Sequence, residues 1–126
     1  MDKLFLADLK DLSEEELVRH IVEYYEVDRE SVEKYDILVA YECVGGLVCN
    51  SSSFFLLEDK TDNKLYEVHG SHCSCCRFEG QWKPEETTLE YLKSDKFIFW
   101  YGGCDNESTK NKKKVFEYIS DLKKRD

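Results

Sequence analysis

Proline is nearly absent from this chain of 126 residues, which contains one proline, six glycines and no internal repeat. A long apolar run is also missing, since no stretch approaches the roughly 18 residues that a membrane-spanning helix needs. The first residues, Met1–Asp8, lack the basic start and the long apolar stretch of a secretory signal. We therefore expect one soluble, intracellular domain, residues 1–126, with no membrane partner.

Basic residues are few relative to acidic ones, and the balance of 18 to 27 gives a net charge of −9. Residues 1–42 alone carry 13 acidic and 5 basic side chains. A field of this sign repels phosphate backbones and anionic lipids, so direct binding of nucleic acid is not expected.

Local patterns predict several helices. Ser13 and Glu16 have the spacing of a capping box ahead of apolar residues at helical intervals, which predicts a helix over residues 13–26. A short helical turn is expected over 28–35. Pro84 followed by two glutamates is typical of a helix start, with Leu89 and Leu92 facing inward. A last helix is predicted to present Val115, Ile119 and Leu122 on one face, with Phe116 beside it.

Strands are predicted at residues 37–41, 54–57, 65–69 and 97–101. A polar turn at 61–64 joins the second and third of them into a hairpin. We therefore expect an α+β fold: a small three- to four-stranded, largely antiparallel sheet with N-terminal, middle and C-terminal helices. Its parts are an acidic helical region (1–35), the sheet with a cysteine and histidine cluster (36–104), and the C-terminal helix (105–126).

The cysteines form the most informative group of residues, because thiols stay reduced inside cells and crowded thiols there favour a metal site. An antiparallel meander of the first three strands brings the loop after residue 41 beside the loop after residue 68. A helical crossover that makes the fourth strand parallel to the third brings Cys104 to that end too. Zinc prefers four thiolate or imidazole ligands, so we predict a structural zinc site. The preferred ligands are Cys49, His72, Cys73 and Cys75, with Cys43, His69, Cys76 and Cys104 as alternatives.

Catalysis is a second interpretation of the same residues. A catalytic zinc would need an open coordination position and a base, for which Glu67 or Glu79 is near in sequence. A cysteine nucleophile, Cys73 or Cys75, paired with His69 or His20 is a further possibility. Thiolate-rich ligation favours a closed structural site, and we expect the protein not to be an enzyme.

The acidic N-terminal helix also has two interpretations. Its carboxylates are either an ordinary solvated surface or a row presented to a basic groove of another protein. On the second interpretation, the predicted partner-binding residues are Glu14, Glu15, Glu23 and Glu26. His20, on the same helix, is expected to be a partly exposed surface histidine.

One stretch of the chain resembles a known family. Lys64–Val68, then Ser71–Cys75, then Glu79–Thr87 resemble a core shared by small phage and prophage proteins, which reads KLYEV, SHCSC and EGQWxPEET. Residues His72, Cys73 and Cys75 fall on this core, whereas Cys76 stands where such proteins more often have tyrosine. The match covers about a quarter of the chain.

The chain is similar in this respect to phage anti-CRISPR proteins that inhibit Cas9. The resemblance implies a protein that binds Cas9 in the cytoplasm of an infected bacterium and blocks loading or cleavage of target DNA. Cas9 holds nucleic acid in positively charged channels, to which an acidic protein is complementary. A zinc-stapled phage accessory protein with a non-nuclease partner, and a small metalloenzyme, remain as alternatives.

Overall fold

The computed structural model describes residues 3–7, 9–44, 51–72, 81–94 and 113–120. Their elements, in chain order, are β1 (Leu4–Ala7), α1 (Glu14–Tyr25), α2 (Arg29–Glu33), β2 (Tyr35–Val44), β3 (Ser51–Asp59), β4 (Leu65–His72), β5 (Glu85–Thr87) and α3 (Leu89–Leu92). Residues 113–120 are also helical.

The strands form one mixed five-stranded sheet in the order β1-β2-β3-β4-β5. β1 runs parallel to β2 and is connected to it through α1 and α2, whereas β2 to β5 are antiparallel neighbours. The α+β class and the central antiparallel meander are thus confirmed. The expected number of strands was too small, because the predicted set lacked the short edge strands β1 and β5.

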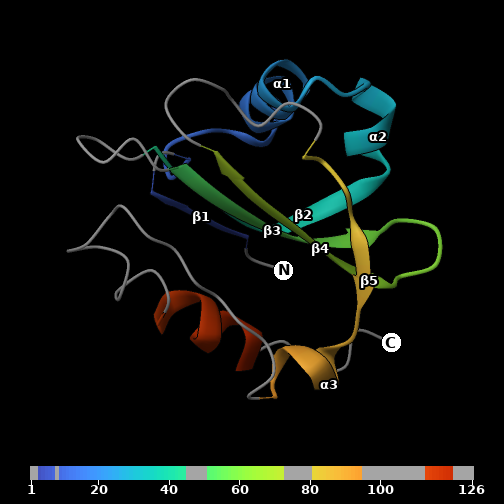
Figure 1. Cartoon of the computed structure of the whole chain (residues 1–126). Coiled ribbons are helices and arrows are strands. Elements are labelled where there is room, and N and C mark those ends of the chain that lie inside the picture. The colour runs from blue at the N-terminus through green and yellow to red at the C-terminus, as the bar shows by residue number, and fades with distance from the viewer. Residues whose placement is uncertain (1–2, 8, 45–50, 73–80, 95–112, 121–126) are drawn as a thin grey trace.

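Helices cover both faces of the sheet, as Figure 1 shows, with α1 and α2 on one face and α3 and the helical segment 113–120 on the other. Each interface has its own core. Leu17, Ile21 and Tyr25 of α1 pack against the sheet together with Phe55 and Trp82. On the opposite face, the buried residues include Leu38, Phe54, Leu56, Leu92, Val115 and Ile119.

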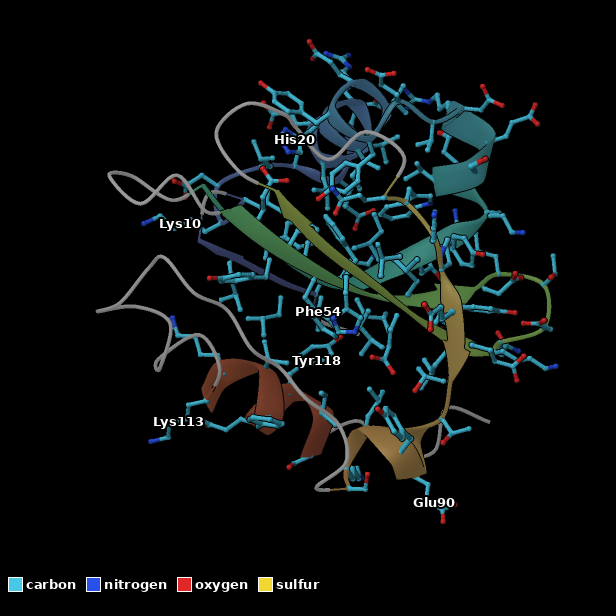
Figure 2. The ribbon with its side chains drawn as sticks, viewed as in Figure 1. Lys10, His20, Phe54, Glu90, Lys113 and Tyr118 are labelled. Atoms are coloured by element: carbon cyan, nitrogen blue, oxygen red, sulfur yellow. The ribbon has the colours of Figure 1, made fainter. Side chains whose placement is uncertain are left out.

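Phe54 lies between the sheet and the helical segment 113–120, with Tyr118 directed toward it from that helix (Figure 2). Phe55, the next residue, is fully buried in the other core. Because both faces are covered, the middle of β2 (residues 37–41) and the middle of β3 (residues 54–57) are continuous apolar runs instead of alternating polar and apolar residues.

The predicted capping box of α1 is confirmed. The Ser13 hydroxyl accepts a hydrogen bond from the Glu16 amide at 3.2 Å, and the Glu16 carboxylate accepts one from the Ser13 amide at 3.0 Å. The predicted short helix after it is α2, and the hairpin with its polar turn is β3–β4.

The helix predicted from Pro84 begins later than expected. Glu85–Thr87 instead pair with β4, because their backbone groups can extend the sheet beside Leu65–Glu67. Thr88 then caps α3 by accepting a hydrogen bond from the Tyr91 amide at 3.1 Å. Leu92 is buried and Leu89 packs against the same core, so the inward-facing residues of this helix were predicted correctly.

At the C-terminal end, residues 113–120 confirm part of the predicted last helix, with Val115 and Ile119 buried. Leu122 and the predicted strand over 97–101 lie outside the described residues. At the N-terminal end, β1 joins the sheet, so the acidic region contributes a strand as well as two helices.

Candidate functional site

The outer surface of α1 and α2 is strongly acidic. Residues 13–34 carry eight carboxylates and only three arginine or lysine side chains. All four residues predicted to bind a partner lie in this part of the chain and are exposed, namely Glu14, Glu15, Glu23 and Glu26. The two ends of α1 nevertheless differ in how these charges are compensated.

At the N-terminal end of α1, internal ion pairs compensate the carboxylates. Lys3 Nζ lies 2.9 Å from Glu14 Oε1, and Arg29 Nη2 contacts the two oxygens of Glu15 at 2.6 and 2.7 Å. Arg29 also donates to Glu33 at 3.0 Å. The hydrogen bond from Arg29 is the main reason that the pKa of Glu15 is lowered. These carboxylates are therefore only partly available to a partner.

From the last turn of α1 to the start of α2, four exposed carboxylates have no such compensation. We call Glu23, Glu26, Asp28 and Glu30 the unpaired acidic patch. No side-chain hydrogen bond or ion pair links them to any other residue that the structure describes. Their field is therefore directed to solvent, where it attracts a positively charged surface.

Two residues of this patch, Glu23 and Glu26, occupy positions that are unfavourable for α1, whereas Asp28 and Glu30 lie at the start of α2, where the helix dipole favours them. The C-terminal end of a helix is the negative end of its dipole, and α1 has no basic residue in its last turn. Glu26 also has left-handed backbone angles, φ 52° and ψ 55°, at a position where glycine or asparagine is preferred. Residues that violate local conformational and charge preferences in this way are expected at functional sites.

A buried polar cluster attaches α1 to the sheet beneath this surface. Glu42 of β2 is 3% exposed, and His20 Nε2 lies 3.0 and 2.9 Å from its two carboxylate oxygens. The Tyr25 hydroxyl donates to Glu42 Oε1 at 3.2 Å, and Tyr24 stacks on the His20 ring with centroids 4.3 Å apart. The cluster therefore fixes the inner side of α1, whose outer surface carries Glu23 and Glu26 (Figure 2).

Burial raises the pKa of Tyr25 well above its ordinary value, and the negative charge of Glu42 adds to the rise. The Ser53 hydroxyl is close enough to Tyr25 to oppose this effect. The Ser53 hydroxyl itself makes no hydrogen bond of good geometry to any residue that the structure describes. The Tyr25 hydroxyl thus stays neutral and donates a hydrogen bond to the buried carboxylate of Glu42.

The cluster was not predicted from the sequence. His20 was expected to be a partly exposed surface residue, and its side chain is 19% exposed but bound to a buried carboxylate. The available signal was Glu42, a charged residue that directly follows the apolar run of residues 37–41. A carboxylate buried at this position needs a hydrogen-bond donor, but the sequence does not indicate which residue provides it.

The ends of the first three predicted strands meet as expected. Val44 at the end of β2 pairs with Ser51 at the start of β3, and Ser51 pairs with His72 at the end of β4. Cys43 occupies the preceding register position, opposite Ser52. The backbone positions of Cys43 and His72 therefore lie at one end of the sheet.

Most of the predicted metal ligands lie outside the described residues, namely Cys49, Cys73, Cys75, Cys76 and Cys104. His69 is half-exposed, and its Nε2 atom lies 2.8 Å from Glu67 Oε1. Among the residues that the structure describes, no group of three acidic, histidine or cysteine side chains is arranged to hold a metal ion. Glu79, the other candidate base, also falls outside them.

No family model matches the sequence, and no curated protein or solved structure is significantly similar to it. None of the helices that the structure describes is long and apolar enough to cross a membrane. The fold and the surface define a small acidic α+β protein with a helical layer on each side of its sheet.

Proposed function

We propose that the protein is a non-catalytic binding protein whose unpaired acidic patch docks on a basic surface of another protein. The observation that carries this proposal is the difference between the two ends of α1. At the C-terminal end of α1, Glu23 and Glu26 have no compensating partner among the described residues, although they oppose the helix dipole. Asp28 and Glu30, at the start of α2, also lack a compensating partner in that part of the chain. Complementary charge of this kind speeds encounter with a partner and makes binding depend on ionic strength.

The partner that we propose is Cas9, in the cytoplasm of an infected bacterium. The resemblance of residues 64–87 to phage proteins supports this choice. The charge of the two partners supports it as well, since a protein of net charge −9 is complementary to positively charged nucleic-acid channels. A bound acidic protein would exclude target DNA from such a channel without any chemistry of its own.

The test is a Cas9 cleavage assay in which the protein is added before or after target DNA. We expect inhibition only when it is added first, with one inhibitor consumed per nuclease. Turnover at substoichiometric amounts would instead favour a small metalloenzyme. No effect on several Cas9 enzymes would favour an accessory protein with a non-nuclease partner, which a pull-down from host lysate would then identify.

Two matched charge reversals test the surface itself. Glu23→Lys with Glu26→Lys reverses two uncompensated carboxylates, and we expect affinity to fall at least about tenfold with a weaker dependence on salt. Glu14→Lys with Glu15→Lys makes the same change in net charge at the end where Lys3 and Arg29 already compensate it. We expect a smaller loss from this control pair, once circular dichroism shows that both variants fold. Equal losses would contradict the role of the patch.

We also propose a structural zinc ion bound by Cys49, His72, Cys73 and Cys75 at the end of the sheet. The register supports it, because Val44, Ser51 and His72 occupy paired positions there. Metal analysis of protein purified without added zinc should give about one equivalent. The variants Cys73→Ser and Cys75→Ser should each lower the melting temperature by about 10 °C or more. Less than about half an equivalent, with unchanged melting, would refute the site.

A further inference from the structure

Residues of β4, β5 and α3 line a groove of about 550 Å³. α3 lies on the face of the sheet away from α1 (Figure 1). The lining of the groove includes Glu67, His69, Glu85, Glu86, Thr87 and Tyr91. Three carboxylates therefore line it, and no lysine or arginine is among the described residues that do. Lys64 approaches only from outside, 3.9 Å from Glu86, and both of these side chains are more than half exposed.

Glu67 is the most informative residue of the groove, because it is a carboxylate that is only 9% exposed. Its Oε1 atom contacts His69 Nε2, and no other hydrogen bond reaches this carboxylate within the described part of the chain. A buried carboxylate is unfavourable unless donors satisfy both of its oxygens, and among the described residues only His69 supplies one. The Thr87 hydroxyl, also buried, has no hydrogen-bond partner among the described residues.

Tyr91, an aromatic residue that is 41% exposed, also lines the groove. The face of such a ring attracts a flat cation, most strongly a guanidinium group. A guanidinium also presents donors in a fixed fork that matches a carboxylate, whereas the ammonium of lysine is a compact and strongly hydrated charge. Carboxylates and an aromatic residue in the lining therefore favour arginine over lysine.

We propose that this groove binds the side chain of an arginine from a partner polypeptide, with Glu67 as its principal acceptor and Tyr91 stacked against it. A metal ion is a weaker candidate, since the described residues contain no group arranged to ligate one. α3, which lines the groove, and α1 and α2, which carry the unpaired acidic patch, lie on opposite faces of the sheet (Figure 1). The proposal therefore does not rest on the identity of the partner proposed above.

The experiment is an NMR titration of the full protein with N-acetylarginine N-methylamide, compared with the matching lysine and citrulline compounds. We expect chemical-shift changes at His69 and Tyr91 with a dissociation constant of about 1 mM for arginine. Lysine should bind at least about threefold more weakly, because it lacks the planar fork. Citrulline, which keeps the shape but not the charge, should not bind measurably.

Variants assign the binding to the groove. Glu67→Gln should weaken arginine binding at least about tenfold, because the charge-assisted hydrogen bond is lost. Glu85→Gln, at an exposed position of the same groove, keeps the test valid if the first variant unfolds, and we expect a loss of about threefold. Glu90→Gln is the matched control, because Glu90 is exposed on α3 and points away from the sheet (Figure 2).

The proposal is overturned if arginine causes no shift, if citrulline binds as well as arginine, or if the shifts lie outside the groove. It is also overturned if Glu85→Gln and Glu90→Gln have equal effects on binding. None of these results depends on Cas9, so they leave the proposed function to be decided by the cleavage assay.

Discussion

Substituting His20 by alanine should destabilise the protein more than substituting any of the exposed charged residues of α1. The Glu42 carboxylate is 3% exposed and has two partners, the His20 imidazole and the Tyr25 hydroxyl. Breaking a fully buried ion pair costs about 3–5 kcal/mol. Because Tyr25 still donates to Glu42 after His20→Ala, we expect the free energy of unfolding to fall by less, about 2–3 kcal/mol.

A double-mutant cycle separates this interaction from the other contacts of the His20 ring, such as its stacking on Tyr24. Urea unfolding of the wild type, His20→Ala, Glu42→Gln and the double variant gives the coupling energy between the two residues. We expect a coupling of about 1–2 kcal/mol, since the two residues share one buried hydrogen-bonded cluster. The matched control is the cycle for Arg29→Ala and Glu15→Gln, an exposed pair on the same helical layer. We expect a much smaller coupling there.

The outcome that refutes this reasoning is a coupling between His20 and Glu42 no larger than that of the control pair. It would mean that Glu42 is adequately satisfied by Tyr25 and water, and that the imidazole contributes only packing. An unchanged slope of unfolding free energy against urea is required for either conclusion, because a changed slope signals an altered denatured state.

Three further changes test other parts of the structure. Glu26→Gly should raise the free energy of unfolding by about 1 kcal/mol, because glycine adopts the left-handed angles of this residue without steric cost; urea unfolding measures it, and a loss of stability would contradict it. Ser13→Ala should lower the same quantity by about 1 kcal/mol through loss of the capping box, with Ser94→Ala as a serine outside α1 for comparison. The raised pKa of Tyr25 means that the unfolded chain loses this proton first, so stability should fall as pH rises above about 10. In Tyr25→Phe this fall should be less steep, without vanishing, since the pKa values of Tyr35 and Tyr66 are raised too; an identical pH profile would show that Tyr25 is not responsible.

Elements with local signals could be predicted from the sequence. The capping residues of α1 and the polar turn between β3 and β4 act within a few residues of one another, so the sequence shows them directly. β1 and β5 have four and three residues, too few for a periodic pattern. Their conformation depends on hydrogen bonds to neighbouring strands, and for this reason the local signal at residues 84–86 predicts the start of a helix where β5 lies.

The same distinction holds for the acidic surface. The number and sign of its charges are visible in the sequence, and all four predicted residues are exposed. Which of them are compensated depends on contacts between distant residues, such as Arg29 with Glu15, 14 positions apart. The link from His20 to Glu42 spans 22 positions and follows no motif. Only the folded chain therefore distinguishes the two ends of α1.

The parallel pairing of β1 with β2 has a consequence for the order in which the protein folds. β3 and β4 are joined by a short turn, so they pair with little loss of chain entropy. β1 and β2 are separated in the chain by α1 and α2, so their pairing closes a longer loop and costs more chain entropy. The hairpin is therefore expected to form early and the N-terminal strand late. We expect the same strand to open first in the folded protein, so amide protons of Leu4–Ala7 should exchange with solvent faster than those of Phe54–Leu57.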